Sequence, residues 1–340
     1  SLITGMYPTS IDVQNHRSHS SSPKVPYHTG YTLPDPVAHL AELFKAGGYY
    51  TMVKDKGDYN FDMESIPWDT EDWDVAVRNQ PFFAIREIDK TSGTVDSPLK
   101  PSEVEVPPYY ADEPEIRKVL ARTLNGITTE VDPMVEAFMA DIEAAGIADN
   151  TIVFFFSDHG KYGFRAKQWL YDTGLNVPLI VWSPGDDTWV KPGARVQNVV
   201  STVDLAATSL SLAGIPVPGY MDGVVFLGPD AEKREYVAAS RDRGDETFDR
   251  IRAIRTGDYK YIRNFYPELP YTQYNHYKFT STELYGNLNV MLEMHEQGAL
   301  DPVQDLFFQP VKPAEELYDV SVDPWEIHNL AQDPAHAQKL

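Results

Sequence analysis

An apolar run that stops on charged side chains constrains this chain more than any other feature. Residues 150–182 read NTIVFFFSDHGKYGFRAKQWLYDTGLNVPLIVW, so that Asp158 and His159 follow the run and a second apolar run begins at Val177. An unbroken apolar run between turn residues is typical of a strand covered on both faces of an α/β sheet. Because ligands of such sheets bind beyond the carboxyl ends of the strands, the sequence predicts functional groups at Asp158 and His159.

Strands and helices alternate along residues 35–240. Apolar residues recur at helical spacing from Glu113 to Gly146, where Asp132-Pro133 is expected to kink or divide the helix. Asp35-Pro36 reads as the start of another helix, which runs through AHLAELFKAGG and is expected to stop at the two glycines of that segment. The alternation predicts an α/β fold with a doubly wound, mainly parallel sheet and helices on both faces. The other expected elements are strands at 49–53, 81–88, 151–157 and 177–182 and a helix at 201–213.

The pattern changes after residue 240. Residues 251–265 read IRAIRTGDYKYIRNF, with two β-rich runs around Thr256-Gly257-Asp258. These runs predict a hairpin within a smaller antiparallel sheet, and a helical stretch is expected near 283–297. The sequence therefore divides into an α/β core at 1–240 and a C-terminal subdomain at 241–340.

Composition excludes several classes of function. The chain of 340 residues carries 29 basic and 51 acidic side chains, a formal net charge of −22, which repels nucleic acid and anionic membranes. It has no cysteine, so disulfides, zinc–thiolate sites and cysteine nucleophiles are excluded for these residues. The sequence contains no apolar run of about 18 residues, the length that a membrane-spanning helix needs. The oligomeric state, including a homo-oligomer, is left open.

Two interpretations of the SDHG segment are open from these residues alone. A carboxylate beside an imidazole can bind a hard divalent cation when other carboxylates join them. Arg165 and Lys167, seven and nine residues beyond Asp158, can then reach an anion held on that cation. In the other interpretation, SDHG is a helix cap and turn, and Lys167 is a solvated charge.

Five segments extend the argument to nearly the whole chain. SDHGKYGFRAKQWLYDTGLNVPLIV, VVSTVDLAATSLSLAGIPVPGYMDG and EELYDVSVDPWEIHNLA resemble segments of type I sulfatases, in matching order. AGGYYTMVKDKGDYNF and RDRGDETFDRIRAIRTGDYKYIRNFYP resemble the heparan N-sulfatase-like bacterial branch of that family. The resemblance implies an alkaline-phosphatase-like fold with a smaller C-terminal sheet. It also implies a hydrolase that cleaves a sulfate ester or N-sulfate of a carbohydrate, with one Ca²⁺ ion and a formylglycine nucleophile, and it favours a periplasmic or secreted location.

The resemblance also implies the residues of the site. Asp158 and His159 fall on metal-ligand positions, His159 standing where many relatives have Asn. Lys56 and Lys167 fall on lysines that contact sulfate, and Asp58 occupies a catalytic position where many members have His. Four further residues are implied as substrate contacts: Arg165, Arg243, Asp245 and Glu246.

The sequence departs from the family pattern in two ways. SLITG, at residues 1–5, matches only the last five positions of the family's C/S-x-P-S-R-x-x-L-L-T-G motif, so formylglycine is expected six positions upstream of Ser1. An Asp-Asp pair of calcium ligands is expected further upstream, in a longer protein or a separate N-terminal piece. A His that relatives carry after the strand at 81–88 is missing, the nearest residues being Thr91 and Ser92. His16, Arg17 and His19 lie near, but not on, positions that bear His and Arg in relatives.

Two other functions are weighed against a sulfatase. A phosphodiesterase or phosphonate monoester hydrolase would use the same fold and turn over phosphoryl groups, but the additional His ligands of its two-metal site are not located in this sequence. A pseudo-sulfatase that binds a sulfated glycan without cleaving it would explain the missing His and nucleophile.

Overall fold

The computed structural model describes residues 1–15, 31–54, 59–61, 67–88, 93–185 and 188–339. These residues form two compact units. One unit comprises Ser1–Asp89 and Asp186–Val237, and the other comprises Lys90–Gly185 and Ala238–Leu340. The chain crosses from the first unit to the second for the last time after Val237, close to the expected domain boundary at 240. Residues 90–185, in contrast, belong to the same unit as the C-terminal residues.

The first unit contains a parallel strand pair. Strand β1 (Tyr50–Lys54) pairs with β2 (Phe82–Arg86), with Tyr50 opposite Phe82 and Lys54 opposite Arg86. The short helix α2 (Trp73–Arg78) connects them, and a 3₁₀ turn, η1, covers Pro8–Ser10. A parallel pair is the arrangement that the alternating sequence pattern predicts, whereas the helix α2 in its connection is not among the expected elements.

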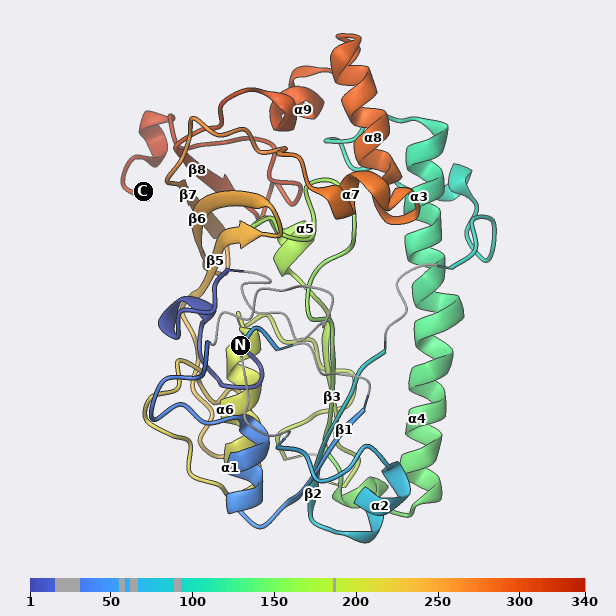
Figure 1. Cartoon of the computed structure of the whole chain (residues 1–340), viewed down its shortest axis with the longest axis vertical. Helices are drawn as coiled ribbons and strands as arrows, with labels where there is room; N and C mark the ends of the chain where they lie inside the picture. The colour runs from blue at the N-terminus through green and yellow to red at the C-terminus, as the bar shows by residue number, and fades with distance from the viewer. Residues whose placement is uncertain (16–30, 55–58, 62–66, 89–92, 186–187, 340) are drawn as a thin grey trace. The chain divides into compact units, whose positions relative to one another are not determined.

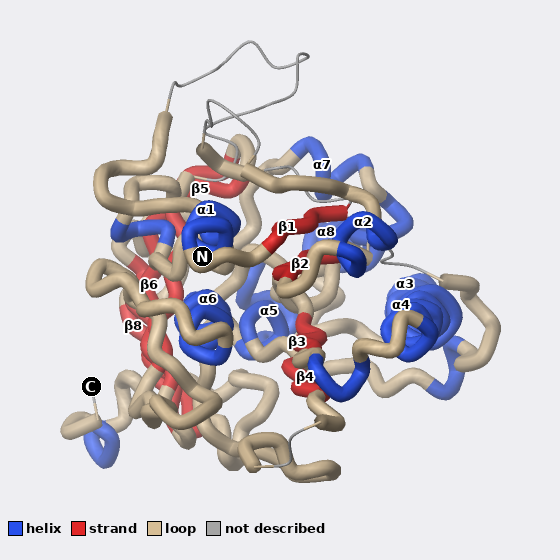
Figure 2. The backbone as a smooth tube through the Cα atoms, turned by 90° about the horizontal axis from the view of Figure 1, so that it is seen from below, coloured by secondary structure: helices blue, strands red, loops and turns tan. Residues whose placement is uncertain are grey.

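Two helices of this unit pack on each other and on β2 (Figures 1 and 2). Helix α1 (Leu40–Ala46) begins later than the expected start at Asp35-Pro36, because His39 caps it: its Nδ1 accepts a hydrogen bond from the Ala41 amide at 3.1 Å. Helix α6 (Thr202–Leu212) begins at a capping box of Ser201 and Asp204. The Phe44 ring of α1 stacks on the Phe83 ring of β2 at 4.0 Å between centroids.

The second unit is built along a long helical segment (Figure 1). Helix α3 (Pro114–Gly126), the π-helical η3 (Ile127–Val131) and helix α4 (Asp132–Ala144) follow one another without a break. Pro133 has no amide proton for the normal helical bond, so a wider π turn just before it takes the place of the expected kink. Helix α8 (Thr282–Glu296) packs against α3.

A second strand pair lies in this unit. Strand β3 (Val153–Phe156) pairs antiparallel with β4 (Leu179–Trp182), with Val153 opposite Trp182. The connecting residues contain only the short helix α5 (Asp172–Leu175) and return the chain at the same end of the pair. An antiparallel strand in a mainly parallel sheet is common in α/β folds, so the α/β class is confirmed while this pairing differs from the parallel one that the sequence suggests.

The expected C-terminal antiparallel sheet is present. Its strands lie in the order β5 (Val237–Gly244), β6 (Thr247–Arg255), β7 (Tyr259–Asn264) and β8 (Glu315–Asp319). Residues 256–258 join β6 to β7 in the predicted hairpin, and β7 pairs antiparallel with β8. The remaining short elements are η2 (Pro101–Glu103), η4 (Ala148–Asn150), α7 (His276–Thr280), α9 (Pro302–Asp305), η5 (Leu306–Phe308) and η6 (Pro334–His336).

The largest core of the second unit is aromatic and encloses the segment that follows β3. Its buried members come from residues 104–121, 164–171 and the C-terminal sheet with its helices. Phe307 is central to it, with the Tyr271 ring stacked at 4.4 Å and the Trp169 ring edge-on at 5.1 Å. The loop predicted to carry the functional groups is therefore anchored in a core rather than lying on the surface.

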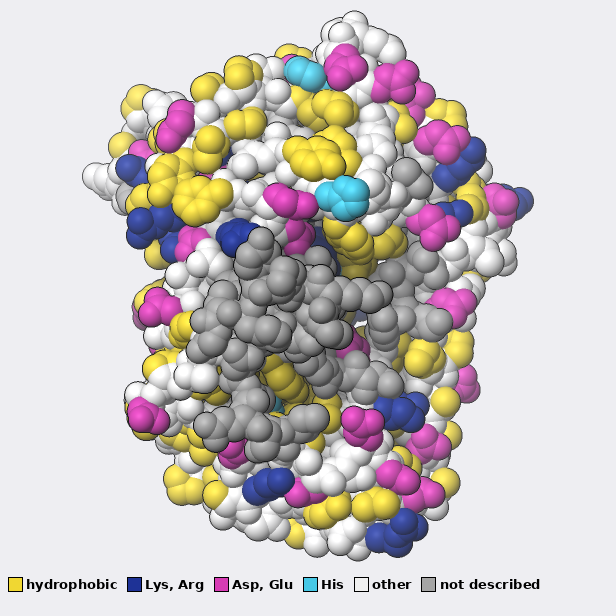
Figure 3. All heavy atoms as spheres, viewed as in Figure 1, with side chains coloured by type: hydrophobic (Ala, Val, Ile, Leu, Met, Phe, Trp, Pro, Cys, Tyr) yellow, Lys and Arg dark blue, Asp and Glu magenta, His cyan; other side chains and the backbone are white. Residues whose placement is uncertain are grey.

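On the face seen in Figure 3, acidic side chains are dispersed over the described residues rather than gathered at one place. Among the helices of the described residues, none combines the length and the apolar character that crossing a membrane requires.

Candidate functional site

The residues after β3 form a tightly held loop. The Ser157 hydroxyl donates a 2.7 Å hydrogen bond to the His159 carbonyl, and the Gly160 amide donates to the Gly174 carbonyl at 2.9 Å. A Cβ atom at Gly160 would lie 2.0 Å from the Thr173 carbonyl oxygen, so only glycine allows this approach. The loop therefore presents Asp158 and His159 in a fixed backbone setting.

Asp158 and His159 place two acceptors side by side. The His159 Nδ1 lies 2.6 Å from the Gly160 carbonyl oxygen, which only accepts, so Nδ1 carries the proton. In the neutral ring, Nε2 is then a lone-pair nitrogen, and it lies 3.6 Å from the Asp158 Oδ1. The Asp158 side chain is 67% exposed and that of His159 27%. Two neighbouring acceptors of this kind suit a cation shared between them.

This pair is not a complete metal site. No group of three or more metal-ligating His, Cys, Asp or Glu side chains is assembled within the described ranges. Calcium takes six to eight oxygen ligands. The described residues thus fit part of a cation site, with donors of the right chemistry but in too small a number.

Lys167 is brought to the same place by an aromatic ring. The Tyr162 ring lies edge-to-face with the His159 ring at 5.4 Å, and the Lys167 Nζ lies 4.7 Å from the centroid of the Tyr162 ring. The Lys167 amide donates to the Lys161 carbonyl at 3.1 Å, which closes the loop between them. The imidazole and the ammonium group thus both contact the Tyr162 ring.

Arg165 lies in the core, not at the surface of the loop. Only 2% of it is exposed, and its guanidinium stacks over the Tyr171 ring at 4.1 Å. It donates to the Trp325 carbonyl at 3.1 Å and to the Glu326 carbonyl. This position does not favour the direct substrate contact predicted from the sequence. Arg165 instead fastens the loop to the C-terminal segment.

Asp172, the carboxylate of the LYD segment, also fastens the loop to the C-terminal segment. Lys260, a buried residue of β7, binds the Asp172 carboxylate and lies 2.7 Å from Glu326 Oε1. The Asp172 amide donates to Glu326 Oε2 at 2.7 Å. Burial acts to raise the pKa of Asp172, but the charges and hydrogen bonds of Lys260 and Arg255 together outweigh it and hold that pKa below its usual value. The YDTG and DPWE segments are therefore joined through one lysine.

The turn between β5 and β6 carries the other predicted contacts. Arg243 and Glu246 are exposed there, and the Arg243 Nε donates to the Asp245 carbonyl at 2.7 Å. The Asp245 carboxylate is half-buried and accepts a 3.1 Å hydrogen bond from the Asn275 side chain. The structure thus gathers Arg243, near the end of β5, with Asp245 and Glu246 of the turn, and only Asp245 is turned toward the interior.

Sequence reasoning missed two buried cations beside this turn, Arg241 and Lys278. The Arg241 guanidinium lies 4.2 Å from the centroid of the Trp169 ring, and the Lys278 Nζ lies 5.7 Å from it. Burial lowers the pKa of Arg241 to about 10. Burial, with the charges of Arg241 and Lys167, lowers the pKa of Lys278 to about 7, against the effect of Asp245. The RDRGDE segment contains Arg241, but the sequence prediction named Arg243 in that segment.

Several predicted site residues cannot be placed. Lys56 and Asp58 lie outside the described residues, as do Thr91 and Ser92. The same holds for the basic residues near the N-terminus, His16, Arg17 and His19. Their part in the site stays a prediction from the sequence.

Comparisons with family models give two matches. The model described as "Sulfatase" matches residues 92–215, and the model "N-sulphoglucosamine sulphohydrolase, C-terminal" matches residues 160–285. The two matched ranges overlap over the segment that carries Lys167. The loop and the β5–β6 turn therefore both lie within matched residues.

The chain is also similar to individual proteins of known sequence. It is 32% identical to an ulvan-active sulfatase of Formosa agariphila over 388 residues, which covers 100% of this chain and 64% of that protein. Arylsulfatase K of Homo sapiens is 34% identical over 107 residues, covering 30% of this chain and 19% of the relative. The chain thus spans about two-thirds, or less, of the length of these relatives.

Solved structures show a related fold at low sequence identity. A 2-O GAG sulfatase superposes with a TM-score of 0.64 and 20% identity, covering 99% of this chain and 77% of that chain. A phosphonate monoester hydrolase from Silicibacter pomeroyi gives a TM-score of 0.63 with 16% identity, covering 100% and 82%. A protein solved with its substrate D-glucosamine-2-N,6-O-disulfate gives 0.60 with 14% identity, covering 99% and 84%. These likenesses establish the fold.

Proposed function

Because the chain belongs to the sulfatase family, we propose that the whole protein hydrolyses a sulfate ester or N-sulfate carried by a carbohydrate. The observation that carries the proposal is the meeting of His159 and Lys167 on the Tyr162 ring, directly after β3. A carbohydrate substrate is supported by the ulvan-active relative and by the N-sulphoglucosamine sulphohydrolase model.

We assign Asp158 and His159 as ligands of one Ca²⁺ ion. Their adjacent lone pairs support this assignment, and the remaining ligands would come from residues outside the described part of the chain. When bound, the ion would supply positive charge close to the sulfuryl oxygens. Formylglycine, expected upstream of Ser1, is proposed as the nucleophile.

Lys167 is proposed to bind the sulfuryl oxygens. Its ammonium group lies over the Tyr162 ring, and its backbone amide is fixed by the hydrogen bond to the Lys161 carbonyl, so we expect its position to be set before substrate arrives. A preorganised donor that faces developing negative charge lowers the barrier by about 3 kcal/mol. Lys56 and Asp58 are proposed as catalytic residues on the strength of the sequence resemblance alone.

The β5–β6 turn is proposed to contact the saccharide. Arg243 and Glu246 are its exposed charged side chains, and Asp245 is fixed by Asn275. We expect Arg243 and Glu246 to affect the choice of substrate, since they are exposed on a turn and take no part in the core. Arg165, in contrast, is proposed to position the loop rather than to touch substrate.

The experiment that tests the proposal is a release assay with the full-length protein. Sulfate release is measured by ion chromatography on a panel of O-sulfated and N-sulfated saccharides and an aryl sulfate, and release of the alcohol is measured on a phosphonate monoester. The proposal requires release from at least one sulfated saccharide. Turnover of the phosphonate monoester alone would identify a phosphonate hydrolase, and saturable saccharide binding with no release would identify a binding protein.

A further inference from the structure

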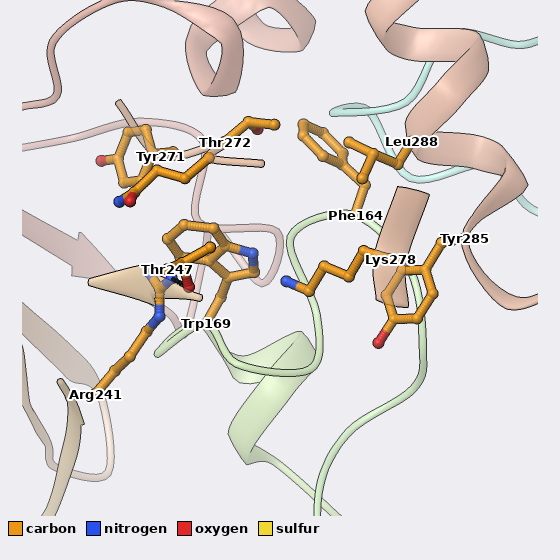
Figure 4. A pocket seen from close by; sticks show the side chains of 11 residues that line it. Phe164, Trp169, Arg241, Thr247, Tyr271, Thr272, Lys278, Tyr285 and Leu288 are labelled. Carbon is orange, nitrogen blue, oxygen red and sulfur yellow. Dashed lines mark hydrogen bonds between the residues drawn. The ribbon is translucent and has the colours of Figure 1, made fainter. Parts of the chain in front are cut away.

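A small cavity lies between the β5–β6 hairpin, the loop after β3 and helices α7 and α8 (Figure 4). Its volume is about 20 Å³, enough for a water molecule or an ion of similar size but not for a sugar ring. The groups that matter in its lining are Trp169, Arg241, Thr247 and Lys278. Figure 4 shows the Lys278 side chain extending into the pocket toward Trp169 and Thr247.

Both cations of this cavity are buried and incompletely paired. Arg241 is 7% exposed and Lys278 9%. The Arg241 Nε is buried without a hydrogen-bond partner. Within the described part of the chain, the Lys278 ammonium group makes no ion pair or hydrogen bond, and it lies 5.7 Å from the centroid of the Trp169 ring and 5.9 Å from that of the Tyr285 ring.

The carboxylates nearby do not balance these charges. Asp249 lies 3.4 Å from Arg241, but it also lies 2.9 Å from the buried Lys312. Asp245 is the carboxylate that acts on Lys278. Three buried cations therefore share two carboxylates among the described residues. Because an uncompensated buried charge is costly, the cavity favours a negatively charged occupant over a neutral one.

We propose that this cavity binds a small monovalent anion of the size of chloride, held between Lys278 and Arg241. The Arg241 Nε supplies an N–H donor that has no other partner, and Lys278 supplies up to three. The site lies beside the proposed sulfate-binding Lys167, whose charge also acts on Lys278. The proposal does not depend on the sulfatase reaction.

Proton binding gives the site an expected pH dependence. Lys278 faces Arg241 from β5, Asp245 from the hairpin turn, Lys167 from the loop and Tyr285 from α8. Its lowered pKa means that the empty site loses a proton near neutral pH. An anion stabilises the protonated amine, so anion binding is expected to be tighter at pH 6 than at pH 9.

The first test is thermal unfolding of the full-length protein in sodium chloride, sodium bromide or sodium gluconate at equal ionic strength. Chloride and bromide are expected to raise Tm saturably over gluconate, more at pH 6 than at pH 9. Lys278→Met should abolish the difference between the salts, and Lys191→Met, at an exposed lysine, should keep it. Equal Tm values in chloride and gluconate for the unaltered protein would overturn the proposal.

The second test does not depend on a variant that folds. Crystals of the unaltered protein grown in bromide are examined by anomalous diffraction at the bromine edge. A bromide peak between Lys278 and Arg241 is expected. Ordinary water density there, with bromide only at surface positions, would show that the cavity is a hydration site and would overturn the proposal.

Discussion

The Arg241 guanidinium lies 4.2 Å from the centroid of the Trp169 ring. This contact joins strand β5 to the segment that begins two residues before Trp169 with Lys167. Trp169 is itself buried against the Phe307 and Tyr271 rings at 5.1 and 5.7 Å. The C-terminal sheet therefore supports the loop on which the proposed catalytic lysine lies.

Removing this support should weaken the fold. Trp169→Ala is expected to lower the free energy of unfolding by about 3–5 kcal/mol, because a large buried ring leaves a cavity. Chemical denaturation followed by circular dichroism measures the change. Trp189→Ala is the matched control, since Trp189 is 41% exposed, and it should change stability by about 0.5 kcal/mol or less. Equal losses for the two variants would contradict the assigned role of Trp169.

A buried carboxylate organises the same core. Glu316 accepts hydrogen bonds from the hydroxyl groups of Tyr171 (2.7 Å), Tyr271 (2.6 Å) and Tyr318 (2.7 Å) and from the Asn264 side chain (2.7 Å). Tyr318→Phe removes one of these bonds and should cost about 1.5–3 kcal/mol of stability. Tyr236→Phe, at an exposed tyrosine, should leave the denaturation midpoint unchanged. A Tyr318→Phe variant as stable as the unaltered protein would show that the bond adds nothing.

Acid should destabilise the first unit through His39. Burial lowers the pKa of His39 to about 4 from an ordinary 6.5, so the folded state holds this ring neutral while the unfolded state takes up a proton. The contribution of His39 to the free energy of unfolding is therefore fully present above pH 6.5, falls between pH 6.5 and 4, and does not change further below pH 4. The loss is roughly 3 kcal/mol for a shift of this size.

Comparison with a variant isolates this effect. His39→Asn keeps a side chain that caps a helix but cannot titrate. The difference in unfolding free energy between the two proteins is measured from pH 7 to 4. It should shift in favour of the variant as the pH falls, and a difference that does not depend on pH would contradict the neutral His39. Glu42, which accepts from the His39 amide, and Tyr59, which contacts the ring, are unchanged in both proteins.

Metal removal tests the assignment of Asp158 and His159. EGTA should lower the Tm of the full-length protein, and added Ca²⁺ should restore it, because a ligand that binds only the folded state stabilises it. Asp158→Ala should make the Tm insensitive to EGTA. Asp96→Ala, at an exposed carboxylate, should retain the response. If EGTA leaves the Tm of the unaltered protein unchanged, the assignment of Asp158 and His159 as calcium ligands is wrong.

Local patterns in the sequence predicted most of the elements and part of the site. Apolar runs located β1 to β4, since strand periodicity is read from neighbouring residues. The SDHG segment was predicted as functional because it follows a strand directly, and Lys167 because it lies nine residues beyond Asp158; their roles stay predictions. The direction in which strands pair could not be predicted from local patterns. Strands β3 and β4 run antiparallel because of the way the connecting loop folds back.

The buried cations escaped prediction for a related reason. Arg165 looks like a surface cation in the sequence, yet it lies in the core. There its guanidinium donates hydrogen bonds to the carbonyl groups of Trp325 and Glu326, which are far from it in the sequence. Lys278 and Arg241 meet at Trp169 only through the tertiary fold. Charge alone does not distinguish a solvated side chain from a buried one.

The most direct measurement compares sulfate release by the full-length protein and its Lys167→Met variant on the best sulfated saccharide. A fall in kcat of about 100-fold or more is expected if Lys167 faces the charge that develops on the sulfuryl group. Lys191→Met should release sulfate at the unaltered rate, and circular dichroism should show both variants folded. If a folded Lys167→Met variant releases sulfate as fast as the unaltered protein, Lys167 has no part in the reaction and the proposed site is wrong.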